Sequence, residues 1–247
     1  MINRIKKRIY SKLRLKALQG NNVLCSYCQG SFITFFPGGV VTKRANAKCP
    51  QCGSLERHRL LWHFLQSKTN LFQDKLKVLH VAPEKLFFSR LSKLPNLEYT
   101  PCAKFGEGFT DEYPKGTVNK DITSLEEVDR TYDVILCSHV LEHIPDDIQA
   151  MKELHRVLRP DGWAILQVPL NPAFDVTYED FSITDPKARE QAFGQYDHVR
   201  VYGKDYSTRL TKAGFKVRQQ KTNELYSSQE IFRYGFDKGE DIFYCQK

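Results

Sequence analysis

The stretch from Thr131 to Asp147 constrains the fold of this chain more than any other part of it. It opens with Asp133 and the apolar run 134–137, which is too short for a helix and is β-branched at its start. Such a run is typical of a strand buried on both faces of a sheet. Residues 146–158 then show one apolar face and predict a helix, with Asp147 as its N-cap. The stretch therefore predicts one strand–helix unit of an α/β sheet.

Polar side chains come directly after this predicted strand. Ser138 and His139 stand at its carboxyl end, and Glu142 and His143 follow shortly after. Because open α/β sheets bind ligands outside the carboxyl ends of their strands, we expect a site at this position.

Further strands and helices alternate on both sides of the central unit. Strands are predicted at 76–82, 97–103, 163–168, 215–218 and 241–246. Helices are predicted at 55–66, 85–93 and 204–213, the last one ended by Gly214. This alternation predicts a mostly parallel sheet with helices on both faces.

Two CxxC pairs precede these elements. They are Cys25 with Cys28 and Cys49 with Cys52, with 20 residues between the pairs. Each pair directs two thiolates at one point, and together they form the tetrahedral sulfur site of structural zinc; free or redox cysteines are the alternative. The residues 31–41 between the pairs, with Pro37-Gly38-Gly39 inside them, predict a hairpin and hence a zinc ribbon. Cysteines in this arrangement indicate a reducing compartment, so we expect a cytoplasmic protein.

The chain has 247 residues, enough for one ordinary domain and a small appendage. We divide it into a basic amphipathic helix at 1–20, the ribbon at 21–58 and the main domain at 59–247. A formal net charge of +8 favours an anionic partner. For residues 2–18 the alternatives are a solvated helix, a phosphate-binding arm and contact with a membrane surface. No apolar run is long enough for a transmembrane segment.

The helix predicted at 55–66 connects the ribbon to the main domain. Its residues Arg57, His58 and Arg59 are candidates for binding an anionic ligand, with a solvated helical turn as the alternative.

The order of motifs carries a family resemblance. The phrase YDVILCSHVLEHIPDD, followed by LHRVLRPDGWAILQVPL at 154–170, resembles the fourth strand, the next helix and the fifth strand of class I S-adenosylmethionine-dependent methyltransferases, type 11-like. The resemblance covers the chain from Leu76 to its end. It implies a Rossmann-like seven-stranded, mostly parallel sheet and the transfer of a methyl group from S-adenosylmethionine.

The resemblance also implies where the cofactor binds. After the first strand the family has a glycine-rich turn, whereas this chain has the HxAPE variant His80-Val-Ala-Pro-Glu84. His80, Ala82, Pro83 and Glu84 are accordingly the implied cofactor residues. Ala82 is small enough for close approach, and Glu84 is placed to bind the amino group of the cofactor.

Two further strand ends complete the implied cofactor site. The acidic residue that usually binds the ribose is replaced by Ala103, with Glu107 or Asp111 as substitutes. Asp121 is implied near the adenine amino group and Ile122 against the ring. Ser138 and His139 are implied at the junction of cofactor and acceptor.

Residues 171–202 are implied to be an insertion that caps the acceptor pocket. Its polar candidates are Tyr178, Glu179, Asp180, Tyr196, Asp197, His198 and Arg200. Within this insertion, His198 beside Asp197 is the expected general base, and His139 is the third catalytic candidate. The expected acceptor is an oxygen or nitrogen of a small polar or anionic molecule: a sugar, nucleotide-linked or secondary-metabolite intermediate. An RNA methyltransferase that binds RNA through the ribbon and the basic arm is one alternative, and a non-catalytic binding module with a degenerate cofactor site is another.

Overall fold

The computed structural model describes residues 13–39, 43–106 and 112–247, which form two compact units. The smaller unit contains the described residues up to Phe72 together with Gln220–Asp241. The larger unit contains Gln73–Gln219 and Ile242–Lys247. Residues 59–72 and 220–241, which the sequence placed in the main domain, thus group with the ribbon. Of the predicted N-terminal helix, residues 13–17 are helical, and the part before residue 13 lies outside the described residues.

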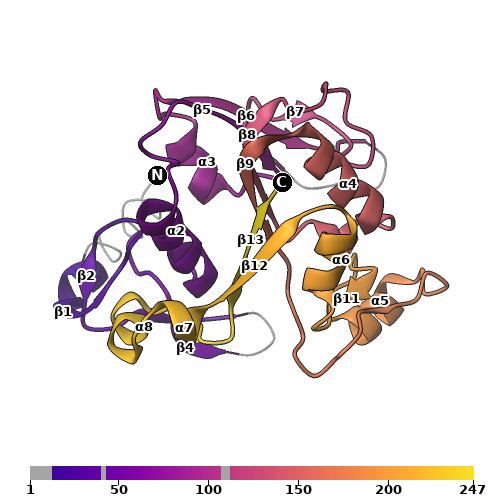
Figure 1. The fold of residues 1–247 in the computed structure, drawn as a ribbon. Coiled ribbons are helices and arrows are strands. Elements are labelled where there is room, and N and C mark those ends of the chain that lie inside the picture. Colours follow the sequence, from indigo (N-terminus) through magenta and orange to yellow (C-terminus); the bar gives the residue numbers. More distant parts are fainter. Residues whose placement is uncertain (1–12, 40–42, 107–111) are drawn as a thin grey trace, which may run out of the picture. The chain divides into compact units, whose positions relative to one another are not determined.

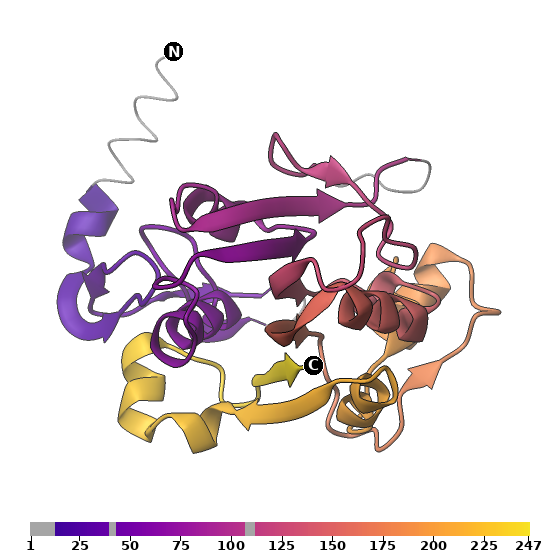
Figure 2. The same cartoon turned by 45° about the horizontal axis from the view of Figure 1, so that its top comes forward.

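The larger unit is built on a seven-stranded sheet with the strand order β12-β13-β9-β8-β5-β6-β7. The strands are β5 (Leu76–Val81), β6 (Leu97–Ala103), β7 (Val118–Asn119), β8 (Tyr132–Ser138), β9 (Leu158–Gln167), β12 (Lys216–Lys221) and β13 (Asp241–Gln246). Parallel pairing joins β7 to β6, β6 to β5, β5 to β8 and β8 to β9, whereas β13 runs antiparallel to β9 (Figures 1 and 2). The expected Rossmann-like, seven-stranded, mostly parallel sheet is confirmed.

Helices cover both faces of this sheet. They are α3 (Lys85–Leu91), η1 (Leu141–His143), α4 (Asp147–Val157), α5 (Pro186–Phe193) and α6 (Tyr206–Lys212). In Figure 1, α3 lies on one face, and α4 and α6 lie on the other. The main core is packed between the strands and these last two helices, where Met151, Leu154 and Leu210 are fully buried.

The helix α4 begins differently from the prediction. Its N-cap is Asp146, whose carboxylate accepts a 3.0 Å hydrogen bond from the backbone N–H of Gln149. Asp147 as the N-cap was therefore wrong. Its carboxylate is only 2% exposed and accepts hydrogen bonds from the Tyr202 hydroxyl at 2.7 Å and from Arg209 at 2.7 Å. A buried carboxylate needs such charged partners, which sequence spacing does not reveal.

The insertion at 171–202 folds against η1. Its short strands β10 (Tyr178–Glu179) and β11 (Arg200–Val201) pair antiparallel. The guanidinium of Arg200 is fully buried and donates to the carbonyl oxygens of Leu141, Ile144 and Pro145. It also binds the carboxylate of Glu179 at 2.9 Å. These two candidate polar residues therefore hold the insertion in place.

The smaller unit contains two hairpins followed by helices. Strand β1 (Gln19–Leu24) pairs with β2 (Ser31–Phe32), and β3 (Phe36–Gly38) pairs with β4 (Arg44–Lys48). The single hairpin predicted within 31–41 was wrong, because β2 pairs with β1 and β3 pairs with β4. The helices are α2 (Glu56–Lys68), α7 (Thr222–Leu225) and α8 (Ser228–Tyr234).

Arg59 of α2 is the central residue of the smaller unit. It is fully buried, and its guanidinium donates to the carbonyl oxygens of Ala47, Ser54, Tyr234 and Gly235 at 2.6–2.9 Å. The interpretation of Arg59 as a residue that binds an anionic ligand was wrong, because its donors are used by backbone carbonyls.

No helix among the described residues is both long and apolar enough to cross a membrane.

Candidate functional site

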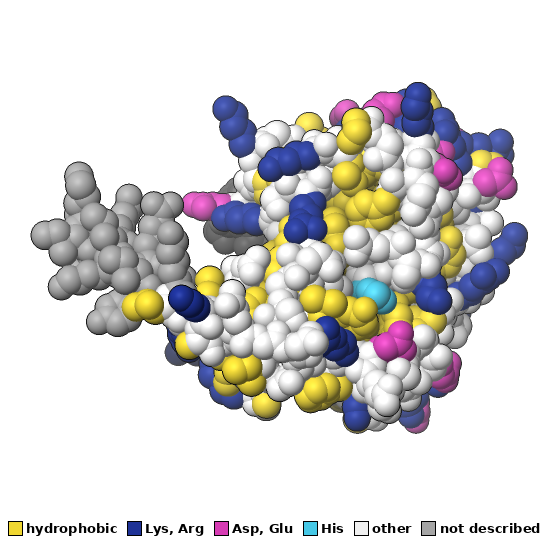
Figure 3. All heavy atoms as spheres, turned by 90° about the vertical axis from the view of Figure 1, so that its left-hand side faces the viewer, with side chains coloured by type: hydrophobic (Ala, Val, Ile, Leu, Met, Phe, Trp, Pro, Cys, Tyr) yellow, Lys and Arg dark blue, Asp and Glu magenta, His cyan; other side chains and the backbone are white. Residues whose placement is uncertain are grey.

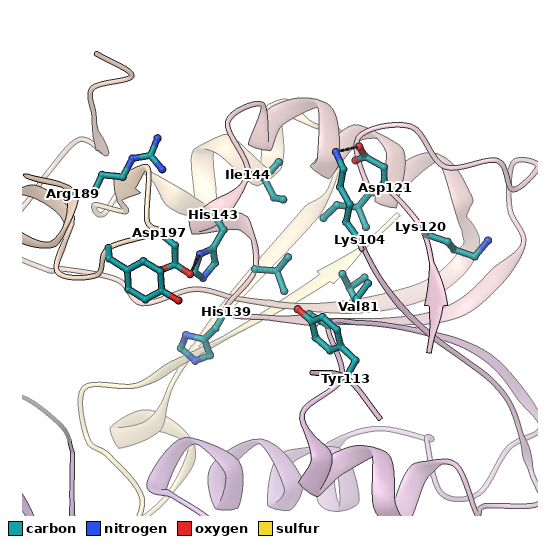
Figure 4. Close-up of a pocket in the computed structure, with 15 residues that line it drawn as sticks. Val81, Lys104, Tyr113, Lys120, Asp121, His139, His143, Ile144, Arg189 and Asp197 are labelled. Atoms are coloured by element: carbon teal, nitrogen blue, oxygen red, sulfur yellow. Dashed lines mark hydrogen bonds and ion pairs between the residues drawn. The ribbon is translucent and has the colours of Figure 1, made fainter. Parts of the chain in front are cut away.

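A cavity of about 280 Å³ opens at the carboxyl edge of the parallel strands in the larger unit. Its walls come from the residues that follow β5, β6, β7 and β8, and from the insertion. Strand β5 lies between β6 and β8 in the sheet, so this is the point where the strand order reverses. Ligands of open α/β sheets bind at such a point. Figure 4 shows the lining side chains in two groups, with Lys104 and Asp121 at one end and His143, Asp197 and Arg189 at the other.

Two of the lining residues hold the backbone in the left-handed region. Ala82 has φ +46° directly after β5, and His139 has φ +56° directly after β8. Residues other than glycine adopt this region at a strain of about 1 kcal/mol or more. The tight turn that glycines normally provide after the first strand is thus made here by Ala82. Its side chain is a single methyl group, so the cavity stays open to close approach.

Asp121 and Ile122 line the cavity after β7, where the sequence placed them. The carboxylate of Asp121 contacts the ammonium of Lys104 at 2.6 Å and accepts two hydrogen bonds from Thr123. Burial raises the pKa of Asp121, but the hydrogen bonds from Lys104 and Thr123 outweigh burial and lower the pKa below its usual value. The carboxylate is therefore ionised at neutral pH. Ile122 is 4% exposed and gives this end of the cavity an apolar wall.

The other implied cofactor residues lie beside the cavity and do not line it. His80 is buried on β5, and its Nδ1 is 2.7 Å from the Tyr99 hydroxyl. Burial lowers the pKa of His80 to about 4, so its ring is neutral. Pro83 is buried, and Glu84 is the N-cap residue of α3. Ser138 is the last residue of β8, and the next residue, His139, lines the cavity. Glu107 and Asp111 lie outside the described residues.

The acceptor end of the cavity contains a histidine–carboxylate pair that differs from the predicted one. Asp197 Oδ2 lies 3.2 Å from Nδ1 of His143, and both residues line the cavity. His198 packs edge-on against the ring of His143, with the ring centroids 4.7 Å apart. Burial lowers the pKa of His198. The structure thus pairs Asp197 with His143, whose ring also packs against His198.

Several lining residues were absent from the predicted site. Arg189 comes from the insertion, Tyr113 from the loop before β7, and Lys104 from the end of β6. Tyr196, one of the polar candidates of the insertion, also lines the cavity. His143 was visible in the sequence as part of the polar group after the central strand. Its place in the cavity depends on η1, a turn that periodicity does not predict.

The four CxxC cysteines meet in the smaller unit, where each offers a sulfur atom within 4.8 Å of the others. The Sγ–Sγ distances are 3.6 Å for Cys25–Cys52 and 3.7 Å for Cys28–Cys49. Ligands about 2.3 Å from a tetrahedral zinc ion are about 3.8 Å apart, so the cluster has the required size. Hydrogen bonds from Cys28, Cys49 and Cys52 lower the pKa of Cys25. Hydrogen bonding to Cys25 in turn raises the pKa of Cys28 and Cys49, so without a metal ion the thiolate form is favoured at Cys25.

Comparisons with known proteins extend these observations. Residues 80–220 match the family described as a methyltransferase domain. The demethylmenaquinone methyltransferase of Chlorobaculum parvum is 31% identical over 101 residues, which cover 40% of this chain and 34% of that protein. The demethylmenaquinone methyltransferase of Chlorobaculum tepidum is 32% identical over 92 residues, covering 37% and 30%. The match thus spans about a third of the length of these curated relatives.

Solved structures with similar folds have low sequence identity to this chain. The [4+2]-cyclase SpnF gives a TM-score of 0.50 at 12% identity, covering 76% of this chain and 80% of that chain. An S-adenosylmethionine-dependent methyltransferase from Mesorhizobium loti gives 0.48 at 15% identity, covering 75% and 97%. At such identities the likeness concerns the fold alone.

Proposed function

We propose that this protein methylates an oxygen or nitrogen atom of a small polar or anionic molecule. The premise is that the chain belongs to the methyltransferase domain family and is an S-adenosylmethionine-dependent methyltransferase. One observation carries the proposal. A single cavity has an apolar and acidic end, formed by Ile122 and Asp121, and an opposite end with the His143–Asp197 pair and Arg189 (Figure 4). Such a cavity suits two different ligands that must meet.

The apolar and acidic end fits the adenosine part of the cofactor. Ala82 allows the backbone to approach a ligand closely, Ile122 offers an apolar surface to a ring, and Asp121 offers a carboxylate to a hydrogen-bond donor. When bound, S-adenosylmethionine supplies a methyl group on a positively charged sulfur, and this carbon–sulfur bond breaks as the acceptor takes the methyl group. His139 also lines the cavity, and we assign it to the junction at which cofactor and acceptor meet.

The opposite end fits the acceptor. The Asp197 carboxylate orients the ring of His143, so this imidazole can take the proton of an acceptor hydroxyl or amine. Arg189 adds a positive charge to the same wall and favours an anionic or polar acceptor. We therefore assign the general base to His143 with Asp197, and treat His198 as its packing neighbour.

For the cysteine cluster we propose a structural zinc ion. Four thiolates complete a tetrahedral coordination shell and leave no position for water or substrate. The ion would stabilise the two hairpins, because a module of this size has few core side chains.

The acceptor distinguishes the proposal from its alternatives. On the face of the molecule in Figure 3, Lys and Arg side chains are scattered and do not form one continuous strip. An RNA acceptor calls for phosphate contacts along a basic groove, and such contacts make binding weaken steeply with salt.

The test combines cofactor binding with methyl transfer. Calorimetry should show binding of S-adenosylmethionine and S-adenosylhomocysteine by the full chain. With a radiolabelled methyl group, we expect label in a small-molecule extract and none in an RNA fraction. Label in RNA, with binding that weakens steeply as salt rises, would replace the small-molecule proposal by the RNA alternative. Absence of cofactor binding by folded protein would leave a binding module.

A further inference from the structure

Three side chains of the larger unit form a second group with metal-ligand geometry. Glu142, His143 and His198 each offer one ligand atom, and these atoms lie within 4.8 Å of one another. Glu142 and His143 belong to η1, whereas His198 belongs to the insertion. The backbone N–H of Val199 donates to the carbonyl of Glu142 at 3.0 Å, which joins the two segments next to the group. The arrangement is thus built into the fold.

One oxygen of the buried Glu142 carboxylate has no hydrogen-bond partner among the described residues. The residue is 1% exposed, and its Oε2 has no hydrogen-bond partner in the described part of the chain. Its Oε1 is 3.5 Å from Nδ1 of His139, too far for a strong hydrogen bond. A buried carboxylate is unfavourable unless a positive charge or several donors meet it. The unpartnered oxygen therefore indicates that a cation belongs beside it.

We propose that Glu142, His143 and His198 bind a divalent metal ion of the first transition series at the acceptor end of the cavity. Two imidazoles and one carboxylate are a donor set that such ions accept, and three protein ligands leave positions open. Ligands about 2.1 Å from the ion are about 3.4 Å apart, so ligand atoms that lie up to 4.8 Å apart must approach one another by at most about 1.4 Å to bind it.

The contact between Asp197 and His143 fits this role. Asp197 engages Nδ1 of His143 at 3.2 Å, which leaves the lone pair of Nε2 for the ion. A carboxylate that holds the far nitrogen of a ligating histidine is the usual support of a metal site. The same contact therefore orients the ligand.

This inference rests on the proposed function and specifies its acceptor as an oxygen. A hydroxyl held at an open position of the ion is more acidic than in water, so its proton passes to solvent. The oxygen then forms a bond to the methyl carbon, while the carbon–sulfur bond breaks and its electron pair stays on sulfur, which becomes a neutral thioether. His143 acts as a ligand in this case, and the ion replaces it as the group that activates the acceptor.

Metal binding is tested on the full chain with its cysteine cluster loaded with zinc. The variants are Glu142→Gln and His198→Asn, and His155→Gln serves as a histidine control because it packs against Phe215 outside the group. Mn²⁺ is the probe, because it prefers oxygen and nitrogen ligands to thiolates. By electron paramagnetic resonance we expect one bound Mn²⁺ in the wild type and the control, and affinity at least tenfold lower in both variants.

Thermal unfolding gives a second readout that a purely structural glutamate would not show. Without added metal, Glu142→Gln should melt above the wild type, because it removes a buried negative charge that has one oxygen without a hydrogen-bond partner. With Mn²⁺, the melting temperature of the wild type should rise and that of the variant should stay constant. Equal Mn²⁺ binding by all four proteins, or none by the wild type, would overturn the proposal. A protein that binds Mn²⁺ but not S-adenosylmethionine would instead refute the proposed function and leave the metal site standing.

Discussion

Lys104 Nζ lies 2.6 Å from Asp121 Oδ2 at the cofactor end of the cavity. The family resemblance implies an acidic residue at the end of the second strand, but this chain has Ala103 followed by Lys104. The lysine therefore pairs with the carboxylate that is expected to meet the adenine. The side chains are 46% and 33% exposed, and a pair so exposed contributes only about 0–1 kcal/mol. A ligand can therefore displace this ion pair at a small cost in free energy.

This pair gives the first prediction. Asp121→Asn should weaken S-adenosylmethionine binding about tenfold or more, because a charged acceptor of a hydrogen bond contributes about 1.5–3 kcal/mol. Lys104→Ala should strengthen binding severalfold at most, because it frees Asp121. Calorimetry measures both. Weaker binding in Lys104→Ala would mean that Lys104 itself contacts the cofactor.

The contact between His143 and Asp197 predicts an effect on turnover. Asp197→Asn should lower kcat by about a hundredfold, because the carboxylate positions the imidazole of His143 at the acceptor end of the cavity. The dissociation constant of S-adenosylmethionine should stay within about twofold of the wild-type value. Asp175→Asn, an exposed acid of the same insertion, is the control. Equal turnover in Asp197→Asn would exclude the assigned role.

His80 predicts how stability depends on pH. Its pKa is lowered from 6.5 to about 4 by burial, so the unfolded chain binds the proton more readily than the folded one. The stabilisation by the neutral ring is complete above pH 6.5 and is lost as the pH falls toward 4. Between pH 7 and pH 5, this residue should account for a loss of about 2 kcal/mol. Urea unfolding followed by circular dichroism should show a smaller loss in His80→Asn.

The cysteine cluster predicts a metal-dependent smaller unit. Cys49→Ser should lose one equivalent of zinc relative to the wild type and become sensitive to proteolysis before Phe72, because zinc binding contributes about 10–16 kcal/mol in small modules. Elemental analysis and limited proteolysis measure the two effects. Cys245→Ala, which changes a buried cysteine of the sheet, should keep the zinc. A zinc content equal to that of the wild type in Cys49→Ser would refute this site.

Arg59 predicts that a change to lysine is not conservative. Arg59→Lys keeps the charge, but a single ammonium cannot reach four carbonyl oxygens that the planar guanidinium binds in different directions. We expect a loss of at least about 2 kcal/mol in the free energy of unfolding of the smaller unit. Arg14→Lys, at an exposed arginine of the same unit, should change little. Similar melting of both variants would mean that these hydrogen bonds are unimportant.

Local sequence patterns predicted the strands and helices well. They predicted poorly which polar side chains contact one another. The central strand, its following helix and the carboxyl-end position of His139 follow from short-range periodicity and strand order. The positions of Asp121 and Ile122 were implied by the family resemblance. The base was assigned to His198 because it adjoins Asp197 in the chain. Neighbouring residues seldom face one another, and in the structure Asp197 faces His143, which lies 54 residues earlier.

The sequence by itself determined the parallel sheet, the cysteine cluster and the edge at which ligands bind, because each depends on residue type and spacing within a short segment. Only the tertiary structure decided which charges meet: Lys104 with Asp121, Asp197 with His143, and Arg59 with the carbonyls of Tyr234 and Gly235. These contacts join segments far apart in the chain, and the need to satisfy buried polar groups selects them only once the backbone has brought the segments together.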